Sequence, residues 1–218
     1  RPALGLIPTG SGNDTRRTLG ISEGLSDATL QLLSGVRKRF DLGICNGIWL
    51  NNSFAAGLDA RVTAKAVELK VTTKRSGLWL YLSALLHVLF HELYPHRVRI
   101  SMDGGEPVTR DVLVIAVTQG PTYGGGFFIT PDAVPDDGLF DVCIIDPLGL
   151  AEALMRLPFV IVGKHTRMRP VHMSRCASLV VESDEPLPAQ IDGEVHLERR
   201  YEVSMAPGAI ECIVPSGR

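Results

Sequence analysis

Hydrophobic residues recur with two periods along this chain, one typical of amphipathic helices and the other of half-buried strands. Helical spacing, or a helix-forming composition, occurs in five segments: residues 15–19, 26–33, 59–70, 77–94 and 150–157. Ser26 begins the second segment as its expected cap, and Gly35 follows as its expected end. Pro95 and Pro158 stop the last two segments. These segments predict helices, and residues 159–163 either continue the last one or form a strand.

Short apolar runs of extended character make up much of the remaining sequence. They are residues 3–7, 39–45, 48–56, 97–102, 108–118, 139–146, 179–182, 189–191, 201–205 and 210–214. Asn46-Gly47 and Asp103-Gly104 are dipeptides that favour tight hairpins. Many short strands joined by turns are typical of an antiparallel sandwich or barrel. We therefore predict an α+β fold, mainly an antiparallel β-sandwich with accessory helices and a short N-terminal α/β remnant.

The predicted elements change from helices to strands near residue 38, which predicts a domain boundary. Residues 1–38 have the strand–turn–helix order of the end of an α/β unit, and residues 39–218 form the predicted β-sandwich domain. The chain opens inside a strand pattern and without an initiator methionine. We therefore expect that further residues originally preceded it.

Composition narrows the class of function. A net charge of −2, with 21% charged residues and no basic tail, argues against nucleic-acid binding. The four cysteines are far apart and form no C-x-x-C pair, which favours a reduced, cytoplasmic setting. Residues 77–90 are apolar round much of the helix but are fewer than the ~20 residues that span a bilayer. This helix either packs on the sheet or contacts lipid chains or a membrane surface.

The first stretch with candidate chemistry is Thr9-Gly10-Ser11-Gly12-Asn13-Asp14, between the first apolar run and the first helix. Its glycines can adopt positive φ and let a ligand approach the backbone. The N–H groups of a helix start favour an anion such as phosphate. The stretch matches neither G-x-x-x-x-G-K-[ST] nor G-x-G-x-x-G. A phosphate site and an ordinary βα turn both fit this pattern.

Three further stretches combine small residues with carboxylates. They are Asn52-Ser53-Phe54-Ala55-Ala56-Gly57-Leu58-Asp59-Ala60, the segment from Tyr123-Gly124-Gly125-Gly126 to Asp136-Asp137-Gly138, and Gln190-Ile191-Asp192-Gly193-Glu194. Close strand–helix packing, a plain turn and a hairpin turn are their respective structural explanations. The functional explanations are a divalent-cation site built from carboxylate and carbonyl oxygens, and a carboxylate pair that supplies a general base.

In order and spacing, these stretches resemble the motifs of the diacylglycerol kinase and sphingosine kinase superfamily, which includes bacterial soluble lipid kinases. The opening stretch matches Pro-x-Gly-[ST]-Gly-Asn-Asp. The later ones match Asn-x-x-x-x-Gly-x-Asp-Ala, Tyr-Gly-Gly-Gly-x-x-x-x-Pro-x-Ala, Asp-Asp-Gly and Asp-Gly-Glu. The resemblance extends from Leu4 to Pro215.

The resemblance implies an ATP-dependent lipid kinase that uses Mg²⁺, with its active site between a nucleotide-binding domain and a β-sandwich domain. It implies that Thr9, Gly10, Ser11, Gly12, Asn13 and Asp14 lie near the nucleotide. It assigns Asp192 and Glu194 to catalysis, with Glu194 as the proton acceptor. Asp137, together with the carbonyls of Val134 and Leu139, matches a structural Mg²⁺ site. The implied partners are a diacylglycerol-like or sphingoid-like lipid and a transient membrane surface.

One departure qualifies this expectation. The superfamily carries a Gly-Gly-Asp-Gly-Thr motif upstream of the opening stretch, and this sequence contains none. We therefore expect these residues alone to bind ATP poorly and to lack kinase activity. Two alternatives remain open, a non-catalytic lipid- or partner-binding module and a related NAD or polyphosphate kinase. The sequence leaves the oligomeric state open, a homodimer included.

Overall fold

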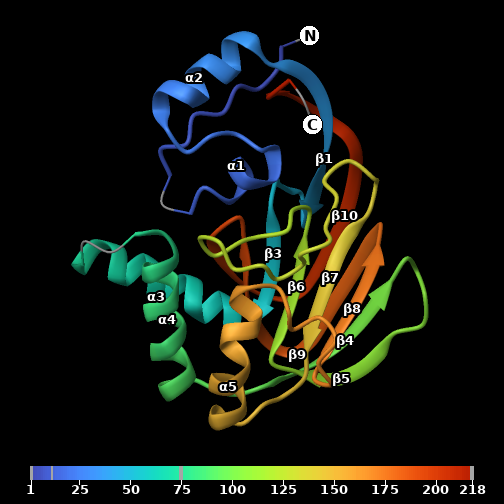
Figure 1. Cartoon of the computed structure of the whole chain (residues 1–218). Helices are drawn as coiled ribbons and strands as arrows, with labels where there is room; N and C mark the ends of the chain where they lie inside the picture. The colour runs from blue at the N-terminus through green and yellow to red at the C-terminus, as the bar shows by residue number, and fades with distance from the viewer. Residues whose placement is uncertain (1, 11, 74–75, 217–218) are drawn as a thin grey trace.

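The computed structural model describes residues 2–10, 12–73 and 76–216. A large curved sheet forms one side of the molecule, three helices cover part of it, and two more helices lie at the end where both termini meet (Figure 1). The helices are α1 (Asp14–Leu19), α2 (Leu25–Ser34), α3 (Leu58–Thr72), α4 (Gly77–His91) and α5 (Leu150–Ile161). Among these described helices, none has the length and apolar character that crossing a bilayer requires.

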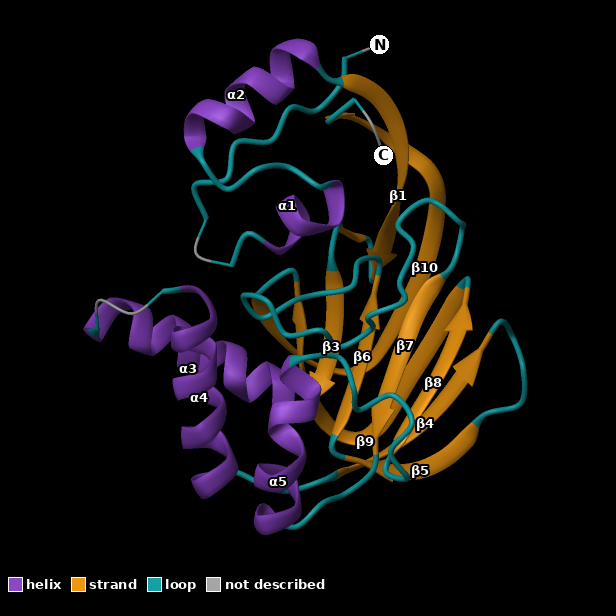
Figure 2. Cartoon of the chain, in the orientation of Figure 1, coloured by secondary structure: helices purple, strands orange, loops and turns teal. Residues whose placement is uncertain are grey.

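Strands contribute most of the regular structure, as Figure 2 shows. They are β1 (Val36–Cys45), β2 (Ile48–Leu50), β3 (Ser53–Gly57), β4 (His96–Met102), β5 (Val108–Val112), β6 (Val114–Thr118), β7 (Phe140–Ile145), β8 (Val171–Cys176), β9 (Ser178–Ile191) and β10 (Glu194–Val214). The strand order is β2-β1-β10-β9-β3-β6-β7-β8, and the pairs are antiparallel.

The ladder divides at β9. Residues 179–182 of this strand pair with β4, and residues 189–191 pair with β3. Val98 and Ile100 of β4 share one buried cluster with Phe54 of β3 and Phe140 of β7, so the two arms of the sheet enclose a common core. The predicted α+β fold with a β-sandwich-like arrangement is therefore confirmed.

The other face of the β3–β6–β7 region packs against α3, α4 and α5. Its inward positions there are small, with Ala55, Ala116 and Cys143 fully buried. Small side chains let the helices approach the sheet closely. All four cysteines are buried free thiols, which agrees with their scattered positions in the sequence.

Residues 3–7 were predicted as the end of a buried strand, and this prediction is wrong. Only Leu4 pairs with the sheet, in a single parallel bridge to Cys212, and Leu4 and Ile7 are 47% and 46% exposed. Pro2 and Pro8 flank the run and lack the N–H groups that a longer ladder would need. The hydrophobic pattern alone did not carry that information.

Two further predictions were wrong because proline was expected to end a strand or a helix. Residues 179–182 and 189–191 belong to one continuous strand, β9, although Pro186 and Pro188 lie between them. The hydroxyl of Tyr201 replaces part of the missing ladder, because it donates to Leu187 O at 2.9 Å and accepts from Glu198 N at 3.0 Å. Pro158 lies inside α5 rather than ending it.

The remaining differences concern element ends. Residues 201–205 and 210–214 are one strand, β10, whereas residues 48–56 and 108–118 are each broken into two. The strand β8 had not been predicted. Gly24 rather than Ser26 is the N-cap of α2, while Gly35 ends it as expected. The Asn46-Gly47 and Asp103-Gly104 turns are present, with Asn46 at φ 48° and Asp103 at φ 49°.

Candidate functional site

A polar cavity of about 210 Å³ lies where the β9–β10 hairpin meets β3, the start of α1 and α3. Its lining residues are Gly12, Asp14, Thr15, Asn51, Asn52, Ser53, Asp59, Thr63, Tyr81, Tyr123, Gly124, Gln190, Asp192 and Gly193. Residues from all the candidate stretches except Asp136-Asp137-Gly138 therefore meet in one cavity. The sequence had not indicated Thr15, Asn51, Thr63 or Tyr81 as site residues.

Asp192 is the first residue of the two-residue turn between β9 and β10, with φ 47°. Its Oδ1 accepts hydrogen bonds from the backbone N–H groups of Asn52 at 2.9 Å and Ser53 at 3.0 Å. Its Oδ2 accepts from Asn51 N at 2.6 Å and from Asn51 Nδ2 at 3.0 Å. The carboxylate is therefore held in one orientation at the edge of the cavity.

The pKa of Asp192 is set by two opposing effects. The surrounding protein removes water from the carboxyl and raises its pKa, and the three backbone N–H donors lower it, with a net upward direction. Gln190 supports the same corner from below. Its Oε1 accepts from Gly193 N at 2.8 Å and its Nε2 donates to Ser53 Oγ at 3.1 Å.

Glu194 is the first residue of β10 and pairs with Ile191. It is exposed and is not among the residues that line the polar cavity. Its side chain makes no hydrogen bond or ion pair with any residue in the described part of the chain. Its predicted partner Asp192 is thus bound and oriented, whereas Glu194 is free to meet an incoming group.

The opening stretch contributes only part of its length to the cavity. Gly12 and Asp14 line it, whereas Thr9 is exposed and Ser11 lies outside the described residues. Asn13 occupies the N-cap position of α1 at φ 54°, but its Oδ1 accepts from Gly10 N at 3.0 Å instead of capping the helix.

Gly10 does not adopt positive φ, contrary to the reason given for it from the sequence. Gly10 and Gly12 both lie close to side-chain oxygens of the same stretch. A Cβ on Gly12 would lie 3.0 Å from Asp14 Oδ2, and one on Gly10 would lie 3.1 Å from Asn13 Oδ1. The close approach therefore involves the chain's own carboxylate and amide oxygens.

Asp59 begins the first turn of α3 and lines the inner end of the polar cavity. Gly57 directly before the helix has φ 89°, and a Cβ there would lie 2.6 Å from Leu113 O, so close strand–helix packing explains this glycine. Burial raises the pKa of Asp59 to about 6, although hydrogen bonds from Tyr123 and Gln190 lower it. Asp59 Oδ2 is buried without a hydrogen-bond partner among the described residues.

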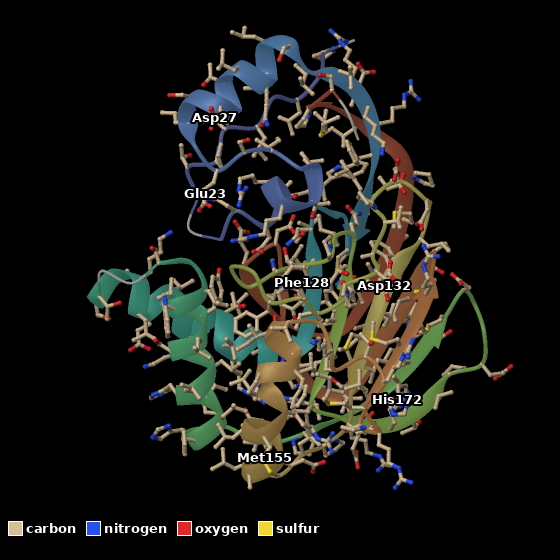
Figure 3. The ribbon with its side chains drawn as sticks, viewed as in Figure 1. Glu23, Asp27, Phe128, Asp132, Met155 and His172 are labelled. Carbon is tan, nitrogen blue, oxygen red and sulfur yellow. The ribbon has the colours of Figure 1, made fainter. Side chains whose placement is uncertain are left out.

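An apolar cavity of about 120 Å³ adjoins the polar one, between the sheet and helices α3, α4 and α5. Asp59, Tyr81, Tyr123 and Gly124 line both cavities. The rest of its wall is almost entirely aliphatic and aromatic, with Leu58, Val62, Leu85, Leu89, Phe127 and Leu157 among its residues. The helix α5 that closes it is seen in Figure 3, where Met155 is labelled on this helix.

The predicted Mg²⁺ site at Asp137, Val134 and Leu139 has a different occupant. Asp137 Oδ2 is paired with the guanidinium of Arg175, and Asp137 Oδ1 accepts from Leu139 N at 3.1 Å. Within the described residues, no three His, Cys, Asp or Glu side chains are grouped to hold a metal ion. Arg175 neutralises the carboxylate in this arrangement, and a Mg²⁺ site at these residues stays a prediction.

Comparison with protein families finds two matches. Residues 52–214 match the family described as YegS C-terminal NAD kinase beta sandwich-like domain. Residues 1–45 match the family described as diacylglycerol kinase catalytic domain. Together the two matches leave residues 46–51 and 215–218 uncovered.

Curated relatives carry consistent names. A diacylglycerol kinase of Mycobacterium tuberculosis is 28% identical over 97% of this chain and 69% of its own length. A diacylglycerol kinase of Bacillus subtilis is 29% identical over 89% of this chain and 63% of its own length. A probable lipid kinase YegS-like of Pseudomonas aeruginosa is 29% identical over 99% of this chain and 69% of its own length. The chain is therefore shorter than these relatives by roughly a third.

Solved structures share the fold. A putative diacylglycerol kinase from Bacillus anthracis superposes with a TM-score of 0.78 at 23% identity, covering 99% of this chain and 70% of that one. A second structure under that description gives a TM-score of 0.74 at 22% identity. At this level of identity the likeness extends to the arrangement of strands and helices.

Proposed function

This chain belongs to the family of the YegS C-terminal NAD kinase beta sandwich-like domain, and from that premise we propose that it forms the lipid-binding side of an ATP-dependent lipid kinase similar to diacylglycerol kinase. The observation that carries the proposal is the junction of the two cavities. Asp59 and Tyr123 lie on the boundary between a polar and an apolar cavity. One molecule with a hydroxyl-bearing head and an aliphatic tail fills both environments.

In the proposed reaction the lipid hydroxyl attacks the γ-phosphorus of ATP, which arrives as its Mg²⁺ complex. A new O–P bond forms, the bond to ADP breaks, and the hydroxyl proton passes to a carboxylate. Glu194 is the proposed acceptor, because it is exposed and unpaired within the described chain. Asp192 is the proposed anchor that fixes the hairpin next to it, since its oxygens already accept four hydrogen bonds.

Asp59 is the group proposed to recognise the lipid head. Its buried Oδ2 has no hydrogen-bond partner in the described residues, and an unpaired buried acceptor costs ~1–3 kcal/mol. A lipid hydroxyl or ammonium at the junction would satisfy that oxygen. The aliphatic wall formed with Leu85 and Leu89 would then hold the tail.

ATP is assigned to the side of the cavity formed by the opening stretch. Residues 1–38 are assigned to the nucleotide-binding domain and residues 39–218 to the lipid-side domain. Because the sequence has no Gly-Gly-Asp-Gly-Thr motif, transfer activity is expected to require a protein segment that supplies one.

A membrane surface is the proposed source of the lipid. Trp79, Leu82, Leu86 and Phe90 share one side of α4, because they are spaced by three or four residues along the helix. Trp79 is 72% exposed and Phe90 is 58% exposed, whereas Leu82 packs partly against the core between helices and sheet. The two aromatic side chains are therefore the uncovered part of this side within the described chain.

Charge near α4 favours an anionic bilayer. Residues 64–91 contain Lys65, Lys70, Lys74 and Arg75 and one acidic residue, Glu68, in a chain whose net charge is −2. The neighbouring side of α4 lines the apolar cavity through Leu85 and Leu89. A lipid leaving the bilayer at this helix would have a short path to the proposed tail site.

Calorimetric titration with dioctanoylglycerol tests the proposed function. Saturable binding is expected, and Asp59→Asn should weaken it about tenfold, the loss expected for a hydrogen bond to a charged group. Asp184→Asn is the matched control, because the side chain of Asp184 is 87% exposed and far along β9 from the cavity. Absence of binding, or equal binding by the Asp59 variant, would contradict the proposal.

The alternatives predict other results. A related NAD kinase would bind NAD in place of dioctanoylglycerol. A non-catalytic lipid module would bind dioctanoylglycerol but would yield no phosphorylated lipid even in a protein that includes the Gly-Gly-Asp-Gly-Thr segment. Transfer of labelled phosphate from ATP, measured with that longer protein, separates these cases.

A further inference from the structure

The triple-glycine turn has a role in the structure that the resemblance does not explain. Gly124, Gly125 and Gly126 have φ values of 64°, 79° and 118°, so each occupies a conformation that side chains other than glycine rarely adopt. Tyr123 and Phe127 on either side exchange backbone hydrogen bonds of 3.2 and 3.0 Å. The turn is therefore a closed loop, and Tyr123 and Gly124 at its start form part of the wall of both cavities.

The start of α1 holds this turn from one side. Asp14 Oδ2 accepts a hydrogen bond from Gly125 N at 2.8 Å. Arg17 Nη1 donates to Asp14 Oδ1 at 2.9 Å and to Gly12 O at 2.7 Å, which fixes the carboxylate. The side chain of Asp14 is only 10% exposed, and burial raises its pKa.

The start of α4 closes on the turn from the other side. A Cβ on Gly125 would lie 2.9 Å from the carbonyl carbon of Gly77 and 3.1 Å from Leu78 N. Gly125 thus fits between the Asp14 carboxylate and the backbone of α4. A displacement of α1 would reach the cavity wall through this contact.

We propose that Asp14 is a positioning residue that fixes the triple-glycine turn and thereby the wall shared by the polar and apolar cavities. This inference rests on the proposed function for its consequence in lipid binding. It differs from the nucleotide contact expected from the sequence, because Gly125 and Arg17 already use both oxygens of the carboxylate. The contact joins distant parts of the sequence, because Gly125 lies 111 positions after Asp14 and 108 positions after Arg17.

Hydrogen exchange tests the contact itself, without any ligand. In Asp14→Ala the amides of residues 123–127 should exchange at least about tenfold faster, since a protecting hydrogen bond is lost. Asp14→Asn keeps an oxygen that can accept from Gly125 N, and should stay within about twofold of the parent. Asp27→Ala, on α2 and labelled in Figure 3, is the control that should change nothing in this segment. Unchanged exchange in Asp14→Ala would overturn the inference.

Titration with dioctanoylglycerol and with MgATP tests the consequence. Asp14→Ala should weaken dioctanoylglycerol binding about fivefold and Asp14→Asn should restore it. MgATP binding, measured in the longer protein that includes the Gly-Gly-Asp-Gly-Thr segment, should be the same in its parent, Asp14→Ala and Asp14→Asn forms. Loss of MgATP binding in both variants with unaltered lipid binding would overturn the positioning role. If the parent protein does not bind dioctanoylglycerol, the proposed function fails, and the exchange experiment still decides the role of Asp14.

Discussion

Asp192 and Asn51 are joined by two hydrogen bonds, from Asn51 N at 2.6 Å and from Asn51 Nδ2 at 3.0 Å, both to Asp192 Oδ2. The other oxygen accepts the N–H groups of Asn52 and Ser53. The carboxylate therefore takes over the hydrogen bonds of a segment where the chain leaves β2 and enters β3. A residue assigned to chemistry from the sequence is also a structural anchor.

Replacing Asp192 should therefore cost stability. Asp192→Ala leaves three backbone N–H groups without their acceptor, and should lower the free energy of unfolding by about 2–4 kcal/mol. Asp192→Asn keeps one acceptor oxygen and tolerates positive φ, and should lose about half as much. Urea unfolding of the three proteins measures these differences.

Asp103 provides the matched control for Asp192. It also begins a hairpin turn, at φ 49°, and its Oδ1 accepts from Ala177 N and Ser178 N. Asp103→Ala should cost about 1–2 kcal/mol, because only two backbone donors lose their partner. Equal free energies of unfolding for Asp192→Ala and the parent protein would show that the carboxylate does not anchor the segment.

Comparing alanine variants of Gly125 and Gly47 separates the cost of a strained backbone conformation from the cost of a steric clash. Their φ values are 79° and 83°, but a Cβ on Gly47 meets nothing within 4 Å, whereas one on Gly125 lies 2.9 Å from Gly77. Gly47→Ala should cost about 1–2 kcal/mol from the backbone conformation alone. Gly125→Ala should cost about 1–3 kcal/mol more, because the start of α4 must move. Matching unfolding midpoints for the two variants would contradict this contact.

Local sequence signals predicted the turns and the helices well. Asn46-Gly47 and Asp103-Gly104 specify positive φ within the dipeptide itself, so no distant residue is needed to form these hairpins. Residues 26–33 carry a helical pattern that Gly35 ends, and α2 covers Leu25–Ser34. Such features depend on neighbours in the sequence and can be derived from it.

The partnerships that build the site could not be derived in this way. Asn51 lies 141 residues from Asp192, and nothing in either segment specifies the other. A detectable signal did exist, because Asn51-Asn52 interrupts an apolar run and Gln190 is a polar residue at a buried strand position. The Asp137 prediction lacked its partner for the same reason, since Arg175 is on a strand that had not been predicted.

His96 should make stability fall as the pH is lowered. Burial and the nearby Arg61 guanidinium lower the pKa of His96 to about 4, and Arg61 Nη1 lies 2.7 Å from its Nε2. The unfolded chain takes up the proton near pH 6.5, but the folded protein does not until about pH 4. Stabilisation by neutral His96 is therefore complete above pH 6.5 and is lost as the pH falls towards 4.

Comparison of His96→Gln with the parent protein isolates this contribution. The free energy of unfolding of the parent should drop by about 1–3 kcal/mol more than that of the variant between pH 7 and pH 4.5. His91→Gln, at an exposed position at the end of α4, should follow the parent. Parallel curves for His96→Gln and the parent would rule out this linkage.

Trp79 can report directly on membrane contact. The sequence has two tryptophans, and Trp49→Phe leaves Trp79 as the single emitter on the outward side of α4. Vesicles containing phosphatidylglycerol should shift its emission to the blue, because an indole entering the interface leaves water. Vesicles of pure phosphatidylcholine should give a smaller shift, since the basic residues that precede α4 in the sequence then have no anionic lipid to attract.

Two substitutions determine whether the shift belongs to this helix. Leu86→Glu places a charge within the outward apolar side of α4 and should abolish the shift. Leu33→Glu is the matched control, because Leu33 is 81% exposed on α2, away from the proposed membrane side. A shift that survives Leu86→Glu contradicts membrane contact through α4. The blue shift could also arise without vesicles, as the protein concentration is raised. If light scattering then gives twice the mass of one chain, the partner of this side of α4 is a second copy of the chain.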